Sequence, residues 1–151
     1  SAAAGSATVA SRRDHVHGPE TAPGFARVIR TAGDVTTTST SLVDLTGATL
    51  TFTTGAFPVQ YAVAQAATIS ATGTSMQCNV NLDGALLHGS QGLQAGGAVG
   101  GSYFDWSFSG QTAALTADEH VIKVVWMVGD DTGTIRASSY INHMFSVMEI
   151  R

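Results

Sequence analysis

The sequence predicts an all-β protein, because its composition favours strands and its apolar residues recur at every second position. Thr and Ser fill 33 of the 151 positions (19 Thr and 14 Ser), Gly fills 17, and charged residues make up only 12%. β-branched Thr favours strands, whereas exposed helices need the Lys and Glu residues that this chain lacks. A mass of 15.5 kDa and a hydrophobic content of 44% suit one domain with one core.

The composition also argues against several functional classes. The net charge of −4 is opposite in sign to that expected of a nucleic-acid binder. No apolar run reaches the ~18 residues of a membrane-spanning helix, so we expect no membrane insertion. Cys78 is the only cysteine, and the chain therefore forms no intrachain disulfide. Residues 1–6 are small and lack the basic and apolar regions of a signal peptide, so we expect them to be linker.

The chain divides into an N-terminal arm, residues 1–24, and a domain, residues 25–151. The arm contains two of the three prolines and shows no apolar periodicity, which predicts an extended segment. From Phe25 onward, short alternating runs are separated by Gly, Asp and Asn, which is typical of strands joined by turns.

The alternation predicts each strand in turn. Met76, Cys78 and Val80 alternate with polar residues, and Asp83-Gly84 then predicts a hairpin turn, because Gly accepts a positive φ without steric cost. Six of the 13 residues at 89–101 are Gly, so we expect a loop there. We predict strands at residues 25–30, 42–45, 49–53, 58–72, 76–82, 103–108, 121–128, 134–137 and 139–150.

This pattern gives about eight to ten strands and no helix. Residues 121–128 are apolar on both faces apart from Lys123, which is typical of a buried central strand. Short strands at regular spacing with Gly-rich and Asp-rich turns favour a two-sheet β-sandwich. Among sandwiches we favour a Greek-key jelly roll.

Two histidines in the arm are the clearest candidates for a metal site. His15 and His17 lie two residues apart, so in an extended segment both imidazoles point to the same side. Imidazole binds Fe, Ni, Cu and Zn, but two ligands on one arm make an incomplete site. Three chains meeting on a threefold axis would supply six imidazoles, which suits an octahedral ion better than zinc. The alternative is a solvated loop pair.

The residues around these histidines carry a family resemblance. Residues 7–18 read ATVASRRDHVHG, and this segment resembles the Asp-His-Val-His arm common in bacteriophage tail-fibre proteins. In related fibres, His-x-His arms bind a metal on the trimer axis, usually described as iron. The resemblance therefore implies that His15 and His17 ligate an iron-like ion.

The C-terminal half carries a second resemblance. Residues 115–126 and 145–150, with the Gly133-Thr134 pair between them, look like the closing strands of phage jelly-roll domains. Asp83-Gly84 matches the hairpin of those domains, whereas Asp118 stands where they have Gly. The resemblance implies a homotrimer of the tumour-necrosis-factor or complement C1q-like type, associated through an apolar face.

Other polar residues suggest weaker sites. His120 beside Asp118 and Glu119 has the composition of a general base with an orienting acid, but a strand-entry turn explains the cluster equally. His88 and His143 are candidate ligands or plain interface histidines. The remaining candidates are a glycosidase-like pair (Asp83 and Asp105), a calcium-binding turn (Asp130-Asp131) and a buried inert thiol (Cys78).

The Gly-rich loop and its flank supply the receptor-binding candidates. Loops on rigid sandwiches carry recognition, which points to Gln91, Gln94 and the exposed-face residue Tyr103. Trp106 shares a face with Phe104 and Phe108, so we place it in the core or a subunit interface.

These observations and resemblances favour a phage virion structural protein, the distal tail-fibre or receptor-binding module that attaches to host cells as a trimer. Its expected partners are further copies of itself, other virion proteins and a host cell-surface glycan or protein. We expect no enzymatic activity. The alternatives are a capsid decoration protein, a glycan-active enzyme and a C1q-like ligand.

Overall fold

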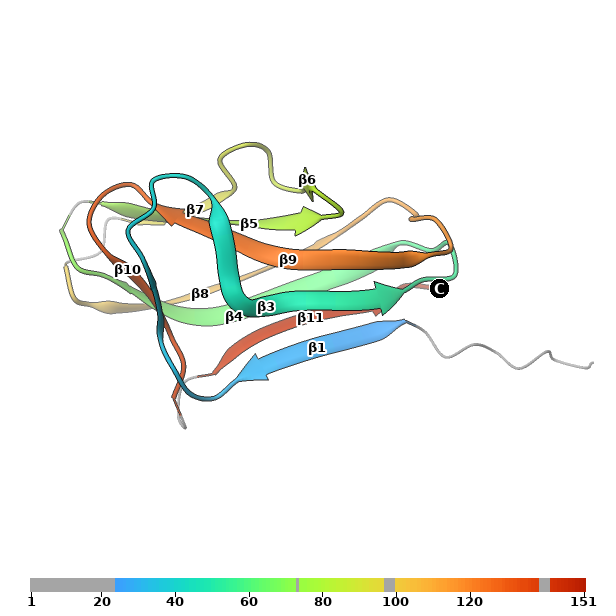
Figure 1. The fold of residues 1–151 in the computed structure, drawn as a ribbon, viewed down its shortest axis with the longest axis horizontal. Helices are drawn as coiled ribbons and strands as arrows, with labels where there is room; N and C mark the ends of the chain where they lie inside the picture. Colours follow the sequence, from blue (N-terminus) through green and yellow to red (C-terminus); the bar gives the residue numbers. More distant parts are fainter. Residues whose placement is uncertain (1–23, 73, 97–99, 139–141) are drawn as a thin grey trace, which may run out of the picture.

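The computed structural model describes residues 24–72, 74–96, 100–138 and 142–151, and within these ranges the chain is all-β. Two antiparallel sheets enclose one core, an arrangement consistent with a β-sandwich (Figure 1). The described residues form eleven strands and no helix. The strands are β1 Phe25–Arg30, β2 Val35–Thr37, β3 Val43–Thr53, β4 Val59–Ile69, β5 Ser75–Leu82, β6 Ala85–Leu86, β7 Leu93–Gly96, β8 Tyr103–Gln111, β9 Glu119–Val128, β10 Gly133–Arg136 and β11 His143–Glu149.

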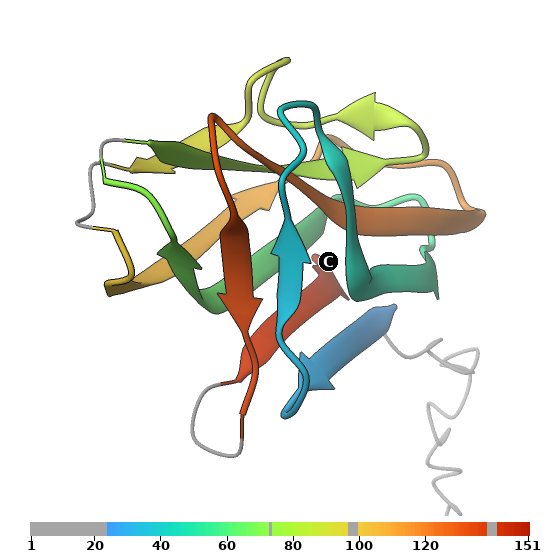
Figure 2. The same cartoon turned by 60° about the vertical axis from the view of Figure 1, so that its left-hand side comes forward.

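The six-stranded sheet is organised around β4. Strand β8 pairs with β4 along one side. On the other side, β11 pairs with residues 59–64 and β10 pairs with residues 66–69, so two short strands share one edge of β4. Strand β1 extends the sheet beyond β11, and β2 extends it beyond β10; Figure 2 shows β2 and β10 side by side.

The five-stranded sheet is organised around β9, which lies between β3 and β5. Strands β6 and β7 both pair with the other side of β5. The prediction of a central strand at residues 121–128 is therefore confirmed. Ile122, Val124 and Trp126 point into the core and are almost fully buried.

The core forms because the apolar member of each alternating pair points between the sheets. Val59 and Val63 on β4 and Met76 and Val80 on β5 all belong to this one buried cluster. Trp106 joins this core at 7% exposure, as the sequence predicted. Burying an aliphatic side chain of this size contributes roughly 1.5–3 kcal/mol, so the alternation is the main determinant of the fold.

Several predicted boundaries are wrong. The predicted strands 42–45 and 49–53 are one strand, β3, which begins at Val43 and whose register shifts between Asp44 and Thr49. Gly47 has φ +76° inside this bulge, so the Gly that suggested a break instead bends a continuous strand. The loop expected at 89–101 contains β7, and β11 begins at His143 instead of Ser139.

The first described residue, Gly24, lies at the same end of the domain as the C-terminal strand. The Glu149 N–H donates to the Gly24 carbonyl, and the Gly55 N–H donates to the Glu149 carboxylate at 2.7 Å. At the opposite end, the β4–β5 and β9–β10 connections are tied by hydrogen bonds between Ser70 and Thr132 (Figure 1). The two ends of the sandwich are thus separated by the full length of β4.

Candidate functional surface

The outward-facing residues of the six-stranded sheet form five rows that cross the strands. Three rows near the arm cross β1, β11, β4 and β8, and we call them the apolar rows. They comprise Phe25, Met148, Gln60 and Gln111; Arg27, Ser146, Ala62 and Ser109; and Ile29, Met144, Ala64 and Ser107. Two polar rows continue toward the far end and cross β10, β4 and β8. They comprise Arg136, Ala66 and Asp105, then Thr134, Thr68 and Tyr103.

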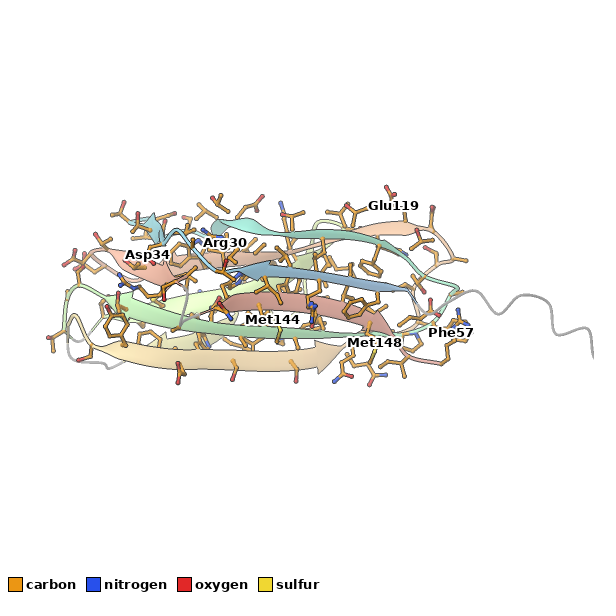
Figure 3. All side chains as sticks on the ribbon, turned by 90° about the horizontal axis from the view of Figure 1, so that it is seen from below. Arg30, Asp34, Phe57, Glu119, Met144 and Met148 are labelled. Carbon is orange, nitrogen blue, oxygen red and sulfur yellow. The ribbon has the colours of Figure 1, made fainter. Side chains whose placement is uncertain are left out.

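The apolar rows carry one charge, Arg27, among twelve residues. Large side chains here are exposed to solvent: Phe25 at 59%, Met148 at 47% and Ile29 at 43%. Figure 3 looks onto this face, with Met144 and Met148 labelled on β11. Isolated exposed apolar residues are ordinary, but several on one contiguous face with a single charge are typical of an interaction surface.

Small residues hollow this face along β4. Ala62, Ala64 and Ala66 point outward in succession, and shallow cavities lie above them between β8 and β11. The largest has a volume of about 410 Å³ and lies where the apolar rows meet the polar rows. Its walls include Asp105, Ser107 and Asn142.

A charged network borders the polar rows. Arg136 Nη1 lies 2.6 Å from Asp34 Oδ2, and Asp34 Oδ1 accepts a hydrogen bond from the Ala137 N–H. The Arg136 guanidinium also lies over the Tyr103 ring, 5.1 Å from its centroid. Tyr103 remains 59% exposed, so the ring is held in place while staying accessible.

Both ring nitrogens of His120 lie within hydrogen-bond distance of an oxygen atom. Nδ1 lies 2.6 Å from Asp83 Oδ2, and Nε2 lies 3.1 Å from the Thr116 carbonyl oxygen. A carboxylate and a carbonyl oxygen both accept hydrogen bonds, so these partners favour the protonated ring. The hydrogen bond to Asp83 raises the pKa of His120, despite the opposing effect of burial. The acidic residue that orients the ring is therefore Asp83, not the expected Asp118 or Glu119.

The same contact fixes the role of Asp83. Burial alone would raise its pKa, but hydrogen bonds from His120 and from the Val121 N–H lower it. Asp83 occupies the predicted hairpin turn with φ +50°, followed by Gly84 with φ +91°. The structure does not bring Asp83 and Asp105 together as a carboxylate pair. Asp83 belongs to the β5–β6 turn of one sheet, whereas Asp105 lies on the outer face of the other.

His88 closes one edge of the sandwich. Its Nε2 is hydrogen-bonded to the Tyr61 hydroxyl at 2.8 Å, and its ring packs edge-on against Phe108. Burial lowers the pKa of His88 and raises that of Tyr61. Fully buried Asn79 accepts hydrogen bonds from the N–H groups of Val80 and His88 and donates to the Gly89 carbonyl. These contacts assign His88 a structural position.

His143 is fully buried opposite Arg30 in the β1–β11 ladder (Figure 3 labels Arg30). Neither ring nitrogen has a hydrogen-bond partner, and Arg30 Nη1 is also buried without one. Burial, together with the Arg30 charge, lowers the pKa of His143 to about 4. The imidazole is therefore neutral at pH 7.

The remaining predicted site residues do not converge. His15 and His17 lie outside the described residues. Gln94 lies on β7 of the five-stranded sheet, whereas Tyr103 lies on the six-stranded sheet. Gln91 is exposed in the loop before β7.

No metal site emerges from the acidic turn or the thiol. Within the described ranges, no group of three or more His, Cys, Asp or Glu side chains is arranged to hold a metal ion. Asp130 Oδ1 accepts the Asp131 N–H, as expected of a turn. Cys78 is buried, and desolvation raises the pKa of its thiol to about 12, which agrees with an inert thiol. Among the same residues, no helix is long and apolar enough to cross a membrane.

Comparison with protein-family models and with curated proteins finds no match to this chain.

Sequence reasoning missed that Asp105 and Arg136 lie in one row of the outer face. Alternation correctly placed Asp105 opposite the core, but Arg136 comes from a strand 31 positions later (136 minus 105). Only the register of β10 and β8 on β4 puts both residues in one row. The run of alternating alanines in β4 was the one available signal for a hollow.

Proposed function

We propose that this chain is a virion structural protein, the distal receptor-binding module of a phage tail fibre. It would act as a homotrimer that attaches to a receptor on the host cell. The observation that carries the proposal is the outer face of the six-stranded sheet. Twelve neighbouring positions with a single charge make a surface suited to burial against another copy, and the resemblance of the arm to tail fibres supplies the biological setting.

The order of the strands supports a jelly roll. Along the chain, β3, β5 and β9 belong to one sheet, whereas β4, β8 and β11 belong to the other. Most connections therefore cross from sheet to sheet, as in double-sheet jelly rolls. Within this class, the sequence resembles tumour-necrosis-factor-like and C1q-like domains.

The arrangement of the two ends of the domain supports an attachment role. Gly24 and Glu149 are hydrogen-bonded at one end, where the rest of a fibre would connect, and the hydrogen-bonded loops at the opposite end would face outward. Three weak sites on one rigid trimer bind a multivalent surface more tightly than one site, because binding at the second becomes intramolecular. In this proposal the module works on the virion, outside the cell.

The arm would add a clamp. Three copies of His15 and His17 around the axis would provide an octahedral site for an iron-like ion. An ion that binds only the assembled trimer stabilises it by mass action. Alanine substitution of both histidines should remove the metal and lower the Tm of the trimer, and unchanged metal content and melting would refute the clamp.

Light scattering tests the trimer directly. The expected mass is three times the 15.5 kDa of the chain. Met144→Glu places a charge in the apolar rows and should reduce the mass to that of a monomer. Met127→Glu is the matched control, because Met127 is likewise half-buried but lies on the outer face of the five-stranded sheet. A monomeric parent protein, or a trimer indifferent to Met144→Glu, would refute the proposed interface.

Cell adsorption tests the attachment role. A fluorescently labelled trimer should bind cells of a susceptible bacterial host and compete with phage for adsorption. Binding to phage capsids in place of cells would overturn this function in favour of capsid decoration.

A further inference from the structure

We propose that the 410 Å³ cavity beside Asp105 binds a neutral saccharide unit. The proposal rests on the attachment function above and deepens it, because it names the chemical class of the receptor and the residues that contact it.

The size of the cavity follows from the residues along β4. Ala64 and Ala66 leave the backbone ladder between β4 and β8 uncovered, and Asp105 and Ser107 rise beside it from β8. Asn142 lines the cavity just before β11. A volume of about 410 Å³ falls in the range of small-molecule sites, roughly 300–1,000 Å³, and accommodates one or two sugar rings.

The polar groups around the cavity match a polyhydroxylated ligand. Asp105 offers a carboxylate that only accepts hydrogen bonds, Asn142 offers both a donor and an acceptor, and Ser107 offers a hydroxyl. Neighbouring sugar hydroxyls both donate and accept, so they can satisfy all three groups. The methyl groups of the two alanines provide an apolar floor for the C–H face of a ring.

The local charge selects a neutral ligand over an acidic one. Arg136 Nη1 already pairs with Asp34 Oδ2 at 2.6 Å, so the Asp34 carboxylate compensates the guanidinium charge that would otherwise attract an anion. Among the described residues, Asp105 has no ion-pair partner within 4.0 Å, so its carboxylate lines the cavity without a neutralising cation. Sialic and uronic acids would be repelled, whereas neutral hexoses would not.

Tyr103 lies outside the cavity lining and supplies an aromatic platform beside it. It lies two residues before Asp105 on the same outer face, in the neighbouring row. Arg136 holds its ring at 5.1 Å, which reduces the entropy lost when a ligand stacks on it. The pairing of a fixed aromatic ring with a carboxylate and an amide is the chemistry that recognises a sugar.

The site is compatible with the trimer. The apolar side chains Phe25, Met148 and Ile29 lie on β1 and β11, toward the arm. The saccharide contacts Tyr103 and Asp105 lie on β8 and belong to the polar rows. Subunit contact and ligand binding meet only at Ala64 and Ser107, which line the cavity and also belong to the last of the apolar rows.

Nuclear magnetic resonance on the full-length ¹⁵N-labelled protein tests the proposal. The probes are the methyl glycosides of glucose, galactose and mannose, with N-acetylneuraminic acid as the acidic comparison. At least one neutral glycoside should shift the amide signals of Asp105, Ser107 and Asn142, and the acid should not. Asp105→Asn and Tyr103→Ala should each weaken binding about tenfold, the effect of losing one charged hydrogen bond or one stacking contact.

Asp131→Asn is the matched control. It removes one carboxylate from an exposed turn, and Asn tolerates the φ of +63° at this position. Its affinity for the glycoside should equal that of the parent protein. Equal weakening by Asp131→Asn would overturn the site, because the effect would then follow net charge.

The other outcomes are equally decisive. Absence of shifts with every neutral glycoside, or equal shifts with the acid, would overturn the saccharide proposal. Loss of trimer mass in Asp105→Asn, without glycoside binding in the parent, would assign the cavity to the subunit contact. A trimer that adsorbs to cells without glycoside shifts refutes only this site, and a monomer that binds glycoside refutes only the trimer.

Discussion

Mild acid should destabilise this protein through His143. The side chain is fully buried, both nitrogens lack partners, and the Arg30 guanidinium lies across the ladder. Burial and the Arg30 charge lower the pKa of the native imidazole to about 4, whereas in the unfolded chain it is near 6.5. Below pH 6.5 the unfolded state therefore binds more protons than the native state. Stability is complete above that value and falls as the pH drops toward 4.

The magnitude follows from the separation of the two pKa values. A difference of about 2.5 units corresponds to about 3 kcal/mol once the pH is below both values. At pH 5 the unfolded imidazole is almost fully protonated and the native one is mostly neutral, so about 2 kcal/mol of this loss is already present. Such a loss is a large fraction of the stability of a small domain, typically about 5–15 kcal/mol.

Urea unfolding at about pH 7.5 and about pH 5 measures the effect, at one fixed protein concentration because the unfolding of an oligomer depends on it. His143→Leu replaces the imidazole with an apolar side chain of similar size that has no titratable group. The parent protein should lose about 2 kcal/mol more than the variant between the two pH values. Equal losses would show that His143 is protonated or solvated in the native state, and the reasoning from its burial would be wrong.

Three further predictions concern other parts of the core. The hydrogen bond to Asp83 raises the pKa of His120, so the stabilisation from this pair is present at low pH and is lost as the pH rises through the native pKa. As the pH is raised, the Tm of the parent protein should therefore fall more steeply than the Tm of His120→Gln. Gly110→Ala should cost roughly 1–3 kcal/mol in urea unfolding, because the new methyl group collides with the Tyr61 hydroxyl; an unchanged midpoint would contradict that contact. Cys78 should resist Ellman's reagent at neutral pH until denaturant is added, since its pKa is raised to about 12, and rapid labelling of native protein would contradict its burial.

Strand positions were largely predictable because inward and outward residues alternate with period two. Strands β4 and β5, which contain Val59 and Met76, each bury every second residue, as the alternation in their sequences predicts. The failures have local causes as well. β7 escaped prediction because it is short and lies among glycines, and the β3 bulge was read as a break because Gly47 interrupts the alternation.

Side-chain partners were less predictable, because they depend on residues distant in the chain. Alternation placed His120 at the entry to a buried strand, but its acidic neighbours in sequence suggested the wrong partner. The β5–β6 hairpin turn brings Asp83 to the ring, although Asp83 lies 37 positions from His120 in the sequence. Likewise, Tyr103 was identified as exposed, while the Arg136 guanidinium over its ring comes from β10.

The sequence by itself determined the all-β class, the single core and the outward direction of Tyr103 and Asp105, because these follow from composition and from a local period of two. Only the tertiary structure decided which outward residues share a face. The register of β8, β10 and β11 on β4 sorts them into apolar rows near the arm and polar rows beyond. Register depends on packing between strands far apart in sequence, and a shift of one residue would turn every side chain to the opposite face.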